Sequence, residues 1–292
     1  MLDIKITDVR ALKGDSAFLI DNGKTSVLYD SGFGFTGFSI AENIKKELGD
    51  RKLDYIFLTH SHYDHALASA HILRYYSDAK VVAGAYASEI FTRSGAKRVM
   101  RELDSAFAEI CGVTEYKFLG DELRVDIPVN DGDLINAGDM TFECLSLPGH
   151  TKCSFGFYCR EKKLFLSTET LGVFDGEDKI LPAYLVSVES SIKSIERVEK
   201  LDIEYLLSPH FGILSREQTE FFLKNMKKSS VEFAEVIKNR LRKGESPEEI
   251  FISIEKKYRR GHMKDIYPID AMRLNTSIMI KLVAKELMGT DI

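Results

Sequence analysis

The segment from Thr59 to His65 concentrates side chains that bind metal ions. His60, His62, Asp64 and His65 form the pattern H-x-H-x-D-H. Nitrogen and carboxylate donors of this kind suit zinc, iron or manganese. Two His separated by one residue can turn their rings toward one metal position, while Asp64 and His65 can reach a second position nearby. The pattern therefore predicts a pair of divalent metal ions that activate a water molecule; a merely polar, histidine-rich loop is the alternative.

The elements around this motif predict where it lies. Tyr55–Leu58 is an apolar run typical of a buried strand, and residues 66–76 have helical spacing. The motif therefore falls on a strand-to-helix loop at the carboxyl end of a strand. Open α/β sheets place their functional sites at such ends.

Three further ligand-type residues follow other predicted strands. His150 lies in Leu147-Pro148-Gly149-His150-Thr151, after the alternating strand 140–147. Glu169 ends the second strand of a hairpin, and His210 follows the last strand, 205–207. Strand, helix and hairpin units thus occur twice, in residues 1–118 and 119–214. Two such halves stacked face to face, with helices outside, would bring these strand ends to one edge.

The composition narrows the class of protein. A chain of 292 residues with 44% hydrophobic and 29% charged residues is globular. A net charge of −5 gives no general attraction to nucleic acid. The chain has neither a bilayer-spanning apolar run nor a signal-peptide pattern at its start. We expect a cytoplasmic protein with a small-molecule substrate, no nucleic-acid or membrane partner, and four buried, unpaired cysteines; a homo-oligomer stays open.

The chain divides by composition near residue 214. Residues 215–292 show no convincing strand and carry two capping boxes, which begin at Ser215 and Ser246. A first tail helix should end at Gly244, and a last one should run from Pro268 to about Leu287. Upstream, residues 85–111 have a helical pattern that either packs on the sheet or overhangs a pocket. We predict a domain of residues 1–214 and a helical extension of residues 215–292.

Together these motifs resemble the metallo-beta-lactamase-fold hydrolase superfamily. The resemblance covers residues 1–214 and rests on Asp30-Ser31-Gly32, the His60–His65 motif, and the segments around His150, Glu169 and His210. It implies an α/β fold, a four-layer αββα sandwich, with a dinuclear site that usually holds zinc. By resemblance, His60, His62 and His150 hold the first metal, Asp64, His65 and His210 hold the second, and Asp30 supports the site from behind.

One position departs from the family pattern. The family usually has Gly-Asp where this chain has Thr168-Glu169, and that Asp bridges the two metals. Glutamate keeps the charge but adds a methylene. Glu169 is therefore either the bridging ligand or an acid that only hydrogen-bonds to a ligand.

The resemblance implies a metal-dependent hydrolase of an ester-like bond, with Asp64 also placed to handle a proton. The helical extension resembles that of thioesterase and glyoxalase II-like members, so we expect a thioester or lactone of a small organic acid. Two alternatives stay open: a dinuclear-iron oxidoreductase, and a ligand-binding or regulatory protein with residual activity. The relatives that reduce oxygen usually have Glu where this chain has His62, and this difference disfavours the oxidoreductase.

Several other residues have two interpretations at this stage. Tyr184, Tyr267 and the pair Phe221-Phe222 either line a substrate pocket beneath the tail or are ordinary packing residues. His262 either reaches the mouth of the site or is a surface loop residue, and the latter is favoured. His71 is expected to have no chemical role.

Overall fold

The computed structural model describes residues 3–292, and the chain forms two compact units. Unit 1 comprises the described residues up to Ser146 together with Phe155–Leu166, and unit 2 comprises Leu147–Ser154 and Ser167–Ile292. This division does not coincide with the boundary predicted at residue 214, which stays a prediction.

The first sheet of unit 1 has six strands, which follow one another in chain order. They are β1 (Lys5–Asp8), β2 (Phe18–Asp21), β3 (Ser26–Tyr29), β4 (Tyr55–Leu58), β5 (Lys80–Gly84) and β6 (Ile127–Val129). β1, β2 and β3 pair antiparallel, and the pairs from β3 to β6 are parallel. Strands β3 and β5 are almost wholly buried, as parallel strands covered on both faces should be. This arrangement points the ends of β3 and β4, and with them Asp30 and the histidine motif, in one direction.

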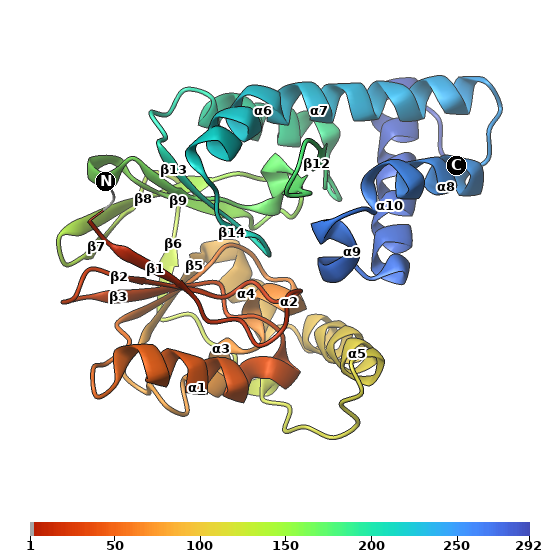
Figure 1. Cartoon of the computed structure of the whole chain (residues 1–292). Coiled ribbons are helices and arrows are strands. Elements are labelled where there is room, and N and C mark those ends of the chain that lie inside the picture. Colours follow the sequence, from red (N-terminus) through yellow and green to blue (C-terminus); the bar gives the residue numbers. More distant parts are fainter. Residues whose placement is uncertain (1–2) are drawn as a thin grey trace. The chain divides into compact units, whose positions relative to one another are not determined.

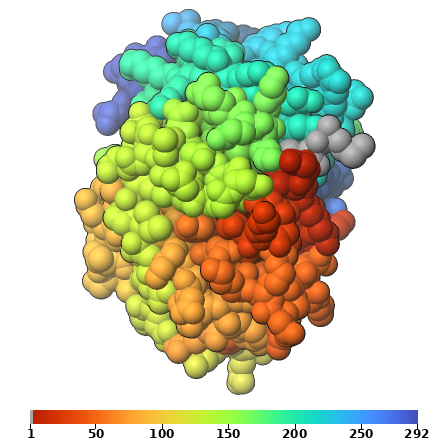
Figure 2. Space-filling model, turned by 90° about the vertical axis from the view of Figure 1, so that its left-hand side faces the viewer, coloured from red at the N-terminus to blue at the C-terminus, as the bar shows by residue number. Residues whose placement is uncertain are grey.

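Four strands of the second sheet also belong to unit 1, in the order β10-β9-β8-β7. They are β7 (Leu134–Ala137), β8 (Met140–Ser146), β9 (Phe155–Cys159) and β10 (Leu164–Leu166). The two sheets pack through Phe57, whose ring lies 5.2 Å from that of Phe142 and 4.7 Å from that of Phe157. On the face drawn in Figure 2 the red N-terminal strands meet the yellow-green β7–β8 segment, where the Tyr55 hydroxyl donates to the Asn136 carbonyl.

The helices of unit 1 connect strands of the first sheet, except η3, which connects β9 and β10 of the second. They are η1 (Gly34–Thr36), α1 (Gly37–Leu48), α2 (Tyr63–Ala66), α3 (Ser69–Ile72), α4 (Ala85–Thr92), α5 (Ser94–Ile110), η2 (Gly120–Glu122) and η3 (Arg160–Lys162). Helix α1 buries Ile40, Ile44 and Leu48 and ends at Gly49, as predicted. Figure 1 shows α1 and α3 beneath the first sheet.

Two helical predictions in unit 1 need correction. The expected helix of residues 66–76 is two short helices, because the Ala68 N–H donates to the Gly32 carbonyl instead of continuing the helical pattern. The segment 85–111 breaks at Arg93, whose backbone is extended. Its second part, α5, buries Asp104 and exposes Val99 and Ile110, so the expected apolar face does not pack on the sheet.

Unit 2 contains the loops that carry His150, Glu169 and His210. Its strands are β11 (Val173–Phe174), β12 (Ile180–Leu181), β13 (Tyr205–Ser208) and β14 (Gly212–Ile213), with η4 (Glu169–Leu171) and α6 (Val188–Val198) among them. β11 pairs with β12, and β13 with β14, both antiparallel. Ser187 caps α6 by accepting from the Ser190 N–H.

The regular secondary structure of the tail, residues 215–292, consists of helices joined by short connections. Its helices are α7 (Arg216–Arg242), α8 (Pro247–Tyr258), α9 (His262–Ile266) and α10 (Ile269–Met288). Both predicted capping boxes are present, at Ser215 and Ser246. The apolar faces of these helices pack around Phe233, Ile250 and Met272, and Figure 1 shows the long α7 beside α6. Within residues 3–292, no helix combines the length and apolar character needed to cross a membrane.

The cysteine prediction holds for three of the four residues. Cys144, Cys153 and Cys159 are buried free thiols, whereas Cys111 is exposed at the end of α5. Burial raises the pKa of Cys144 to about 12 and that of Cys159 to about 11. These thiols therefore stay protonated near neutral pH, which suits their role as small packing residues.

Candidate metal centre

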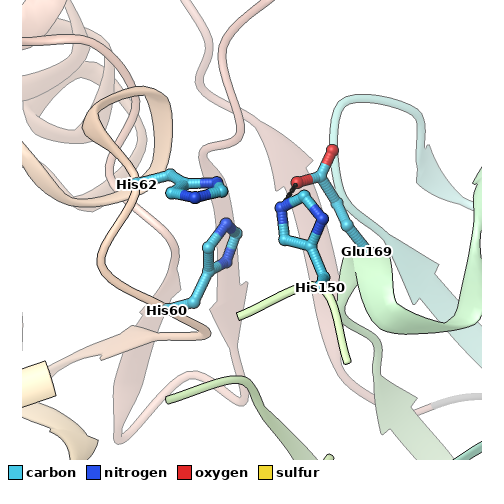
Figure 3. A group of neighbouring side chains, drawn as sticks. All are labelled: His60, His62, His150 and Glu169. Atoms are coloured by element: carbon cyan, nitrogen blue, oxygen red, sulfur yellow. Dashed lines mark ion pairs between the residues drawn. The ribbon is translucent and has the colours of Figure 1, made fainter. Parts of the chain in front are cut away.

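In unit 1, the loop after β4 gathers the ligand-type side chains of the histidine motif. The ring centroid of His60 lies 4.6 Å from that of His62 and 4.1 Å from that of His65 (Figure 3 shows His60 and His62). His60 and His65 are buried, and the Asp64 carboxylate lies 3.7 Å from Nε2 of His65. The side chain of Asp64 keeps about a fifth of its surface exposed to solvent.

The Asp30 carboxylate organises this loop from behind. It is fully buried and accepts hydrogen bonds from the Thr59 N–H at 2.8 Å and the Ser16 hydroxyl at 2.9 Å. Its Oδ2 atom lies 2.7 Å from Nδ1 of His65. Because a carboxylate only accepts, Nδ1 of His65 carries the proton and Nε2 presents a lone pair. The contact fixes the His65 ring and its tautomer, as carboxylates behind metal-binding histidines do in other proteins.

Thr59 sets the ring of His60 in the same way. Its hydroxyl donates to Asp30 at 3.0 Å and lies 2.9 Å from Nδ1 of His60. A hydroxyl has one proton to donate, so Nδ1 of His60 donates to it and Nε2 of His60 is the atom suited to bind a metal. Sequence reasoning did not assign this role to Thr59, although the residue directly precedes the motif.

In unit 2, the loop after β8 presents His150. Gly149 has φ +146°, and a Cβ there would lie 2.1 Å from the Ser191 hydroxyl, so the approach of α6 requires glycine. Nδ1 of His150 donates to the Ala183 carbonyl at 2.6 Å. Since a carbonyl only accepts, Nε2 of His150 is the atom suited to bind a metal.

The Glu169 carboxylate lies close to two histidines of unit 2. Its Oε2 atom lies 2.8 Å from Nε2 of His150, and its Oε1 atom lies 3.4 Å from Nε2 of His210 (Figure 3 shows the first pair). The side chain is 13% exposed. One oxygen thus faces each of the two histidines that the resemblance assigns to different metals.

His210 occupies a constrained turn after β13. Its φ is +60°, and the Phe211 N–H donates across it to the Pro209 carbonyl at 2.7 Å. Nε2 of His262 donates to the His210 carbonyl at 3.1 Å. His262 keeps part of its surface exposed and is the first residue of α9, so it lies in a helix rather than in a loop. Its imidazole also packs against the turn that carries a ligand-type histidine.

The other ambiguous residues are mostly packing residues. Tyr184 is 1% exposed and packs against Phe233 in the apolar core of the tail. Phe222 is fully buried against Phe174. His71 is buried, donates through Nε2 to the Lys117 carbonyl and has its pKa lowered by burial, so it stays neutral near neutral pH.

The donor set fits a divalent metal ion. Each unit contributes His, Asp or Glu side chains of the kind that could hold one. In His60, His65 and His150 the Nδ1 atom is occupied by a supporting contact, which leaves Nε2 for a ligand. An imidazole lone pair and a carboxylate oxygen do not approach to 2.8 Å, as in His150 and Glu169, without a proton or a cation between them.

The buried hydroxyls beside the ligand loops of unit 2 add to this fit. Thr168 Oγ1 and Ser208 Oγ are buried and have no hydrogen-bond partner among the residues that the structure describes. Buried hydroxyls are normally satisfied, so these two indicate a place where water or another polar species completes the local environment.

Comparison with known proteins defines the class. A model of the metallo-beta-lactamase superfamily matches residues 13–210, which is more than half of the chain. The chain therefore belongs to the metallo-beta-lactamase superfamily. This confirms the predicted α/β fold class, the αββα sandwich with a C-terminal helical extension.

Particular relatives share the fold at low sequence identity. Human acyl-coenzyme A thioesterase MBLAC2 is 23% identical over 215 residues, covering 69% of this chain and 74% of the human protein. A metallo-beta-lactamase family protein of Thermus thermophilus has a TM-score of 0.62 at 19% identity, covering 99% of this chain and 95% of its own. An archaeal superfamily member from Sulfolobus tokodaii has a TM-score of 0.57 at 19% identity, covering 75% and 85%.

Proposed function

We propose that this protein is a metal-dependent hydrolase that cleaves an ester-like bond, a thioester or lactone of a small organic acid. The observation that carries the proposal is the Glu169 carboxylate, with one oxygen facing His150 and the other facing His210. A carboxylate so placed suits a bridge between two cations. The relative of known activity, a human acyl-coenzyme A thioesterase, supports the thioester class.

In this proposal the metal ligands are those that the family resemblance implies. His60, His62 and His150 would hold one metal ion, Asp64, His65 and His210 would hold a second, and Glu169 would be a ligand of both. When bound, a pair of divalent ions lowers the pKa of a water molecule and polarises the carbonyl of the substrate. Zinc is favoured, and iron or manganese also suit these donors.

The chain's own residues then have separate tasks. Asp30, Thr59 and the Ala183 carbonyl hold three imidazoles in the tautomer that presents Nε2. Asp64 is the partly exposed acid of the group, and we assign to it the transfer of a proton to or from solvent.

A combined metal and substrate assay tests the proposal. Protein purified without chelator should contain about two divalent ions per chain and should hydrolyse acyl-coenzyme A thioesters or lactones faster than phosphodiesters. Chelation should abolish the activity, and added zinc should restore it. Metal-loaded protein that hydrolyses none of these substrates would favour the ligand-binding alternative, and faster cleavage of the phosphodiester would contradict the proposed substrate class.

The remaining sequence-based expectations keep the status of predictions. They are the cytoplasmic location, the absence of a nucleic-acid partner and the open question of a homo-oligomer.

A further inference from the structure

The tail loop, residues 260–262, leads from α8 into the first residue of α9 and contacts the turn that carries His210. Nε2 of His262 donates to the His210 carbonyl at 3.1 Å. The His262 ring also packs edge-on against Phe211, with centroids 5.0 Å apart. Both contacts lie within unit 2 and join residues that are far apart in the chain.

The turn at His210 needs such support. A non-glycine residue with φ of +60° occupies a left-handed conformation that is unfavourable for an L-amino acid. Residues persist there only where surrounding contacts hold them. One local contact is the bond from the Phe211 N–H to the Pro209 carbonyl, and the Phe211 ring also packs against the distant Phe174, with centroids 5.3 Å apart. The bond from His262 is a non-local contact made directly to the His210 backbone.

The supporting loop is itself anchored through Arg260. The guanidinium contacts Asp175 Oδ2 through Nη2 at 2.8 Å and Nε at 3.1 Å, and it also contacts Asp178. Asp175 is 2% exposed, and its other oxygen accepts from the Glu177 and Lys179 N–H groups at 2.9 Å each. Arg260 thus ties the tail loop to the turn between β11 and β12.

The turn and the tail loop are also closely packed. A Cβ at Gly176 would lie 3.0 Å from the Phe211 ring and 3.6 Å from Cβ of His262. A Cβ at Gly261 would lie 3.3 Å from the Glu177 carboxylate. Both glycines have positive φ, +88° and +49°, so their backbones would be strained with any side chain. The tail loop and the turn between β11 and β12 are therefore packed closely at both glycines.

We propose that His262, anchored through Arg260, is a positioning residue that holds His210 as a ligand of the second metal ion. The inference rests on the proposed function, because it concerns the same site. His262 acts on the backbone of His210, and the tail helices thereby take part in metal binding as well as in folding.

A pair of substitutions tests the hydrogen bond itself. His262→Met removes the N–H donor at similar volume, and His262→Gln keeps an N–H donor at similar reach. Stepwise binding of zinc would be measured by competition with a fluorescent chelator, together with thermal unfolding of the metal-free protein. We expect H262M to weaken one of the two binding steps about tenfold or more, and H262Q to restore most of it.

The anchor is tested with a matched control. Arg260→Gln breaks the contact with buried Asp175, while Arg273→Gln breaks an exposed tail ion pair with Glu248. We expect R260Q to weaken the same zinc-binding step as H262M, and R273Q to leave both steps unchanged.

Distinct outcomes separate this inference from the proposed function. Wild-type protein that binds no zinc would overturn both. Wild-type protein that binds two ions, with H262M binding both equally well, would overturn the positioning role alone. The positioning role would also be overturned if H262Q bound zinc as weakly as H262M. It would likewise be overturned if H262M weakened both binding steps equally and lowered the melting temperature, because such an effect would be general destabilisation.

Discussion

Glu169 is the residue at which this chain departs from the family pattern, and its geometry explains how the departure is accommodated. The longer side chain begins a short 3-10 helix, and its two oxygens lie 2.8 Å and 3.4 Å from the Nε2 atoms of His150 and His210. The added methylene therefore does not take the carboxylate away from the histidines. Glu169 as a bridging ligand stays a prediction.

Substitution of Glu169 by Gln tests this role. The amide lacks the negative charge and offers one acceptor oxygen, so it cannot contact two cations as a carboxylate does. We expect E169Q to retain about one metal ion per chain and to lose activity by about a hundredfold or more. Metal content measured after dialysis checks the outcome, with Glu169→Asp as the control that keeps the charge. Full metal content in E169Q would mean that Glu169 only hydrogen-bonds to a ligand.

At the scale of elements, α5 buries an acid instead of its apolar stripe. Asp104 accepts from the Gly34 N–H at 2.9 Å and the Tyr116 hydroxyl at 2.6 Å, and it is fully buried. Burial raises the pKa of Asp104 to about 6. The helix is therefore oriented by a polar contact to the loop after β3, which hydrophobic periodicity does not reveal.

This pKa predicts a dependence of stability on pH. The pKa of this carboxyl is about 4 in an unfolded chain and about 6 in the folded protein. Between these two pH values Asp104 keeps its proton in the folded state and has released it in the unfolded chain. The contribution of Asp104 to stability therefore falls by about 3 kcal/mol as pH rises through that window and is constant above it.

Asp104→Asn removes the titration and isolates the effect. The free energy of unfolding of D104N minus that of wild type should rise by up to about 3 kcal/mol between roughly pH 4 and pH 6.5. Urea unfolding of both proteins across this range measures the difference. A difference that does not change with pH would show that Asp104 has no raised pKa.

The tail helix α10 caps α6. One carboxylate oxygen of Glu286 accepts from the Val188 N–H at 3.0 Å, the Glu189 N–H at 3.2 Å and the Ser187 hydroxyl at 3.3 Å. An acid at a helix N-terminus satisfies free N–H groups and complements the helix dipole. The tail thus stabilises an element that lies before the predicted boundary at residue 214.

Glu286→Ala should lower the free energy of unfolding by about 1 kcal/mol, because it leaves these N–H groups to solvent. Lys285→Ala, an exposed neighbour on α10, is the control and should change stability little. Chemical denaturation of the two variants compares them directly. Equal stability of E286A and wild type would mean that water replaces the carboxylate without loss.

At the scale of the whole molecule, the predicted metal ligands are divided between the two units. Unit 1 supplies His60, His62, Asp64 and His65, and unit 2 supplies His150, Glu169 and His210. Ions bound by these residues would stabilise the folded chain, because a ligand that binds only the folded state shifts the unfolding equilibrium.

Metal removal tests this coupling. At a zinc concentration about a hundred times the dissociation constant, binding stabilises the chain by about 2.7 kcal/mol per site. We expect chelator-treated protein to unfold at a temperature about 5 °C or more below that of zinc-loaded protein, and calorimetry measures the shift. A melting temperature that is the same with and without zinc would argue against tight binding by folded protein.

The sequence by itself determined the features that depend on local pattern. The motif from His60 to His65, the buried strand before it and the capping boxes at Ser215 and Ser246 were all predicted from neighbouring residues. Turn signals, capping residues and apolar periodicity act over a few residues, so they can be interpreted without the fold. The family resemblance followed because its motifs are also short.

Only the tertiary structure decided which distant groups meet. The burial of Asp104, the contact of His150 with the Ala183 carbonyl and the bond from His262 to His210 join residues 33 to 70 positions apart. Such contacts depend on how helices and loops pack after the chain has folded, and no local pattern specifies them. That is why sequence reasoning predicted His210 as a ligand and did not predict the contact that His262 makes with its backbone.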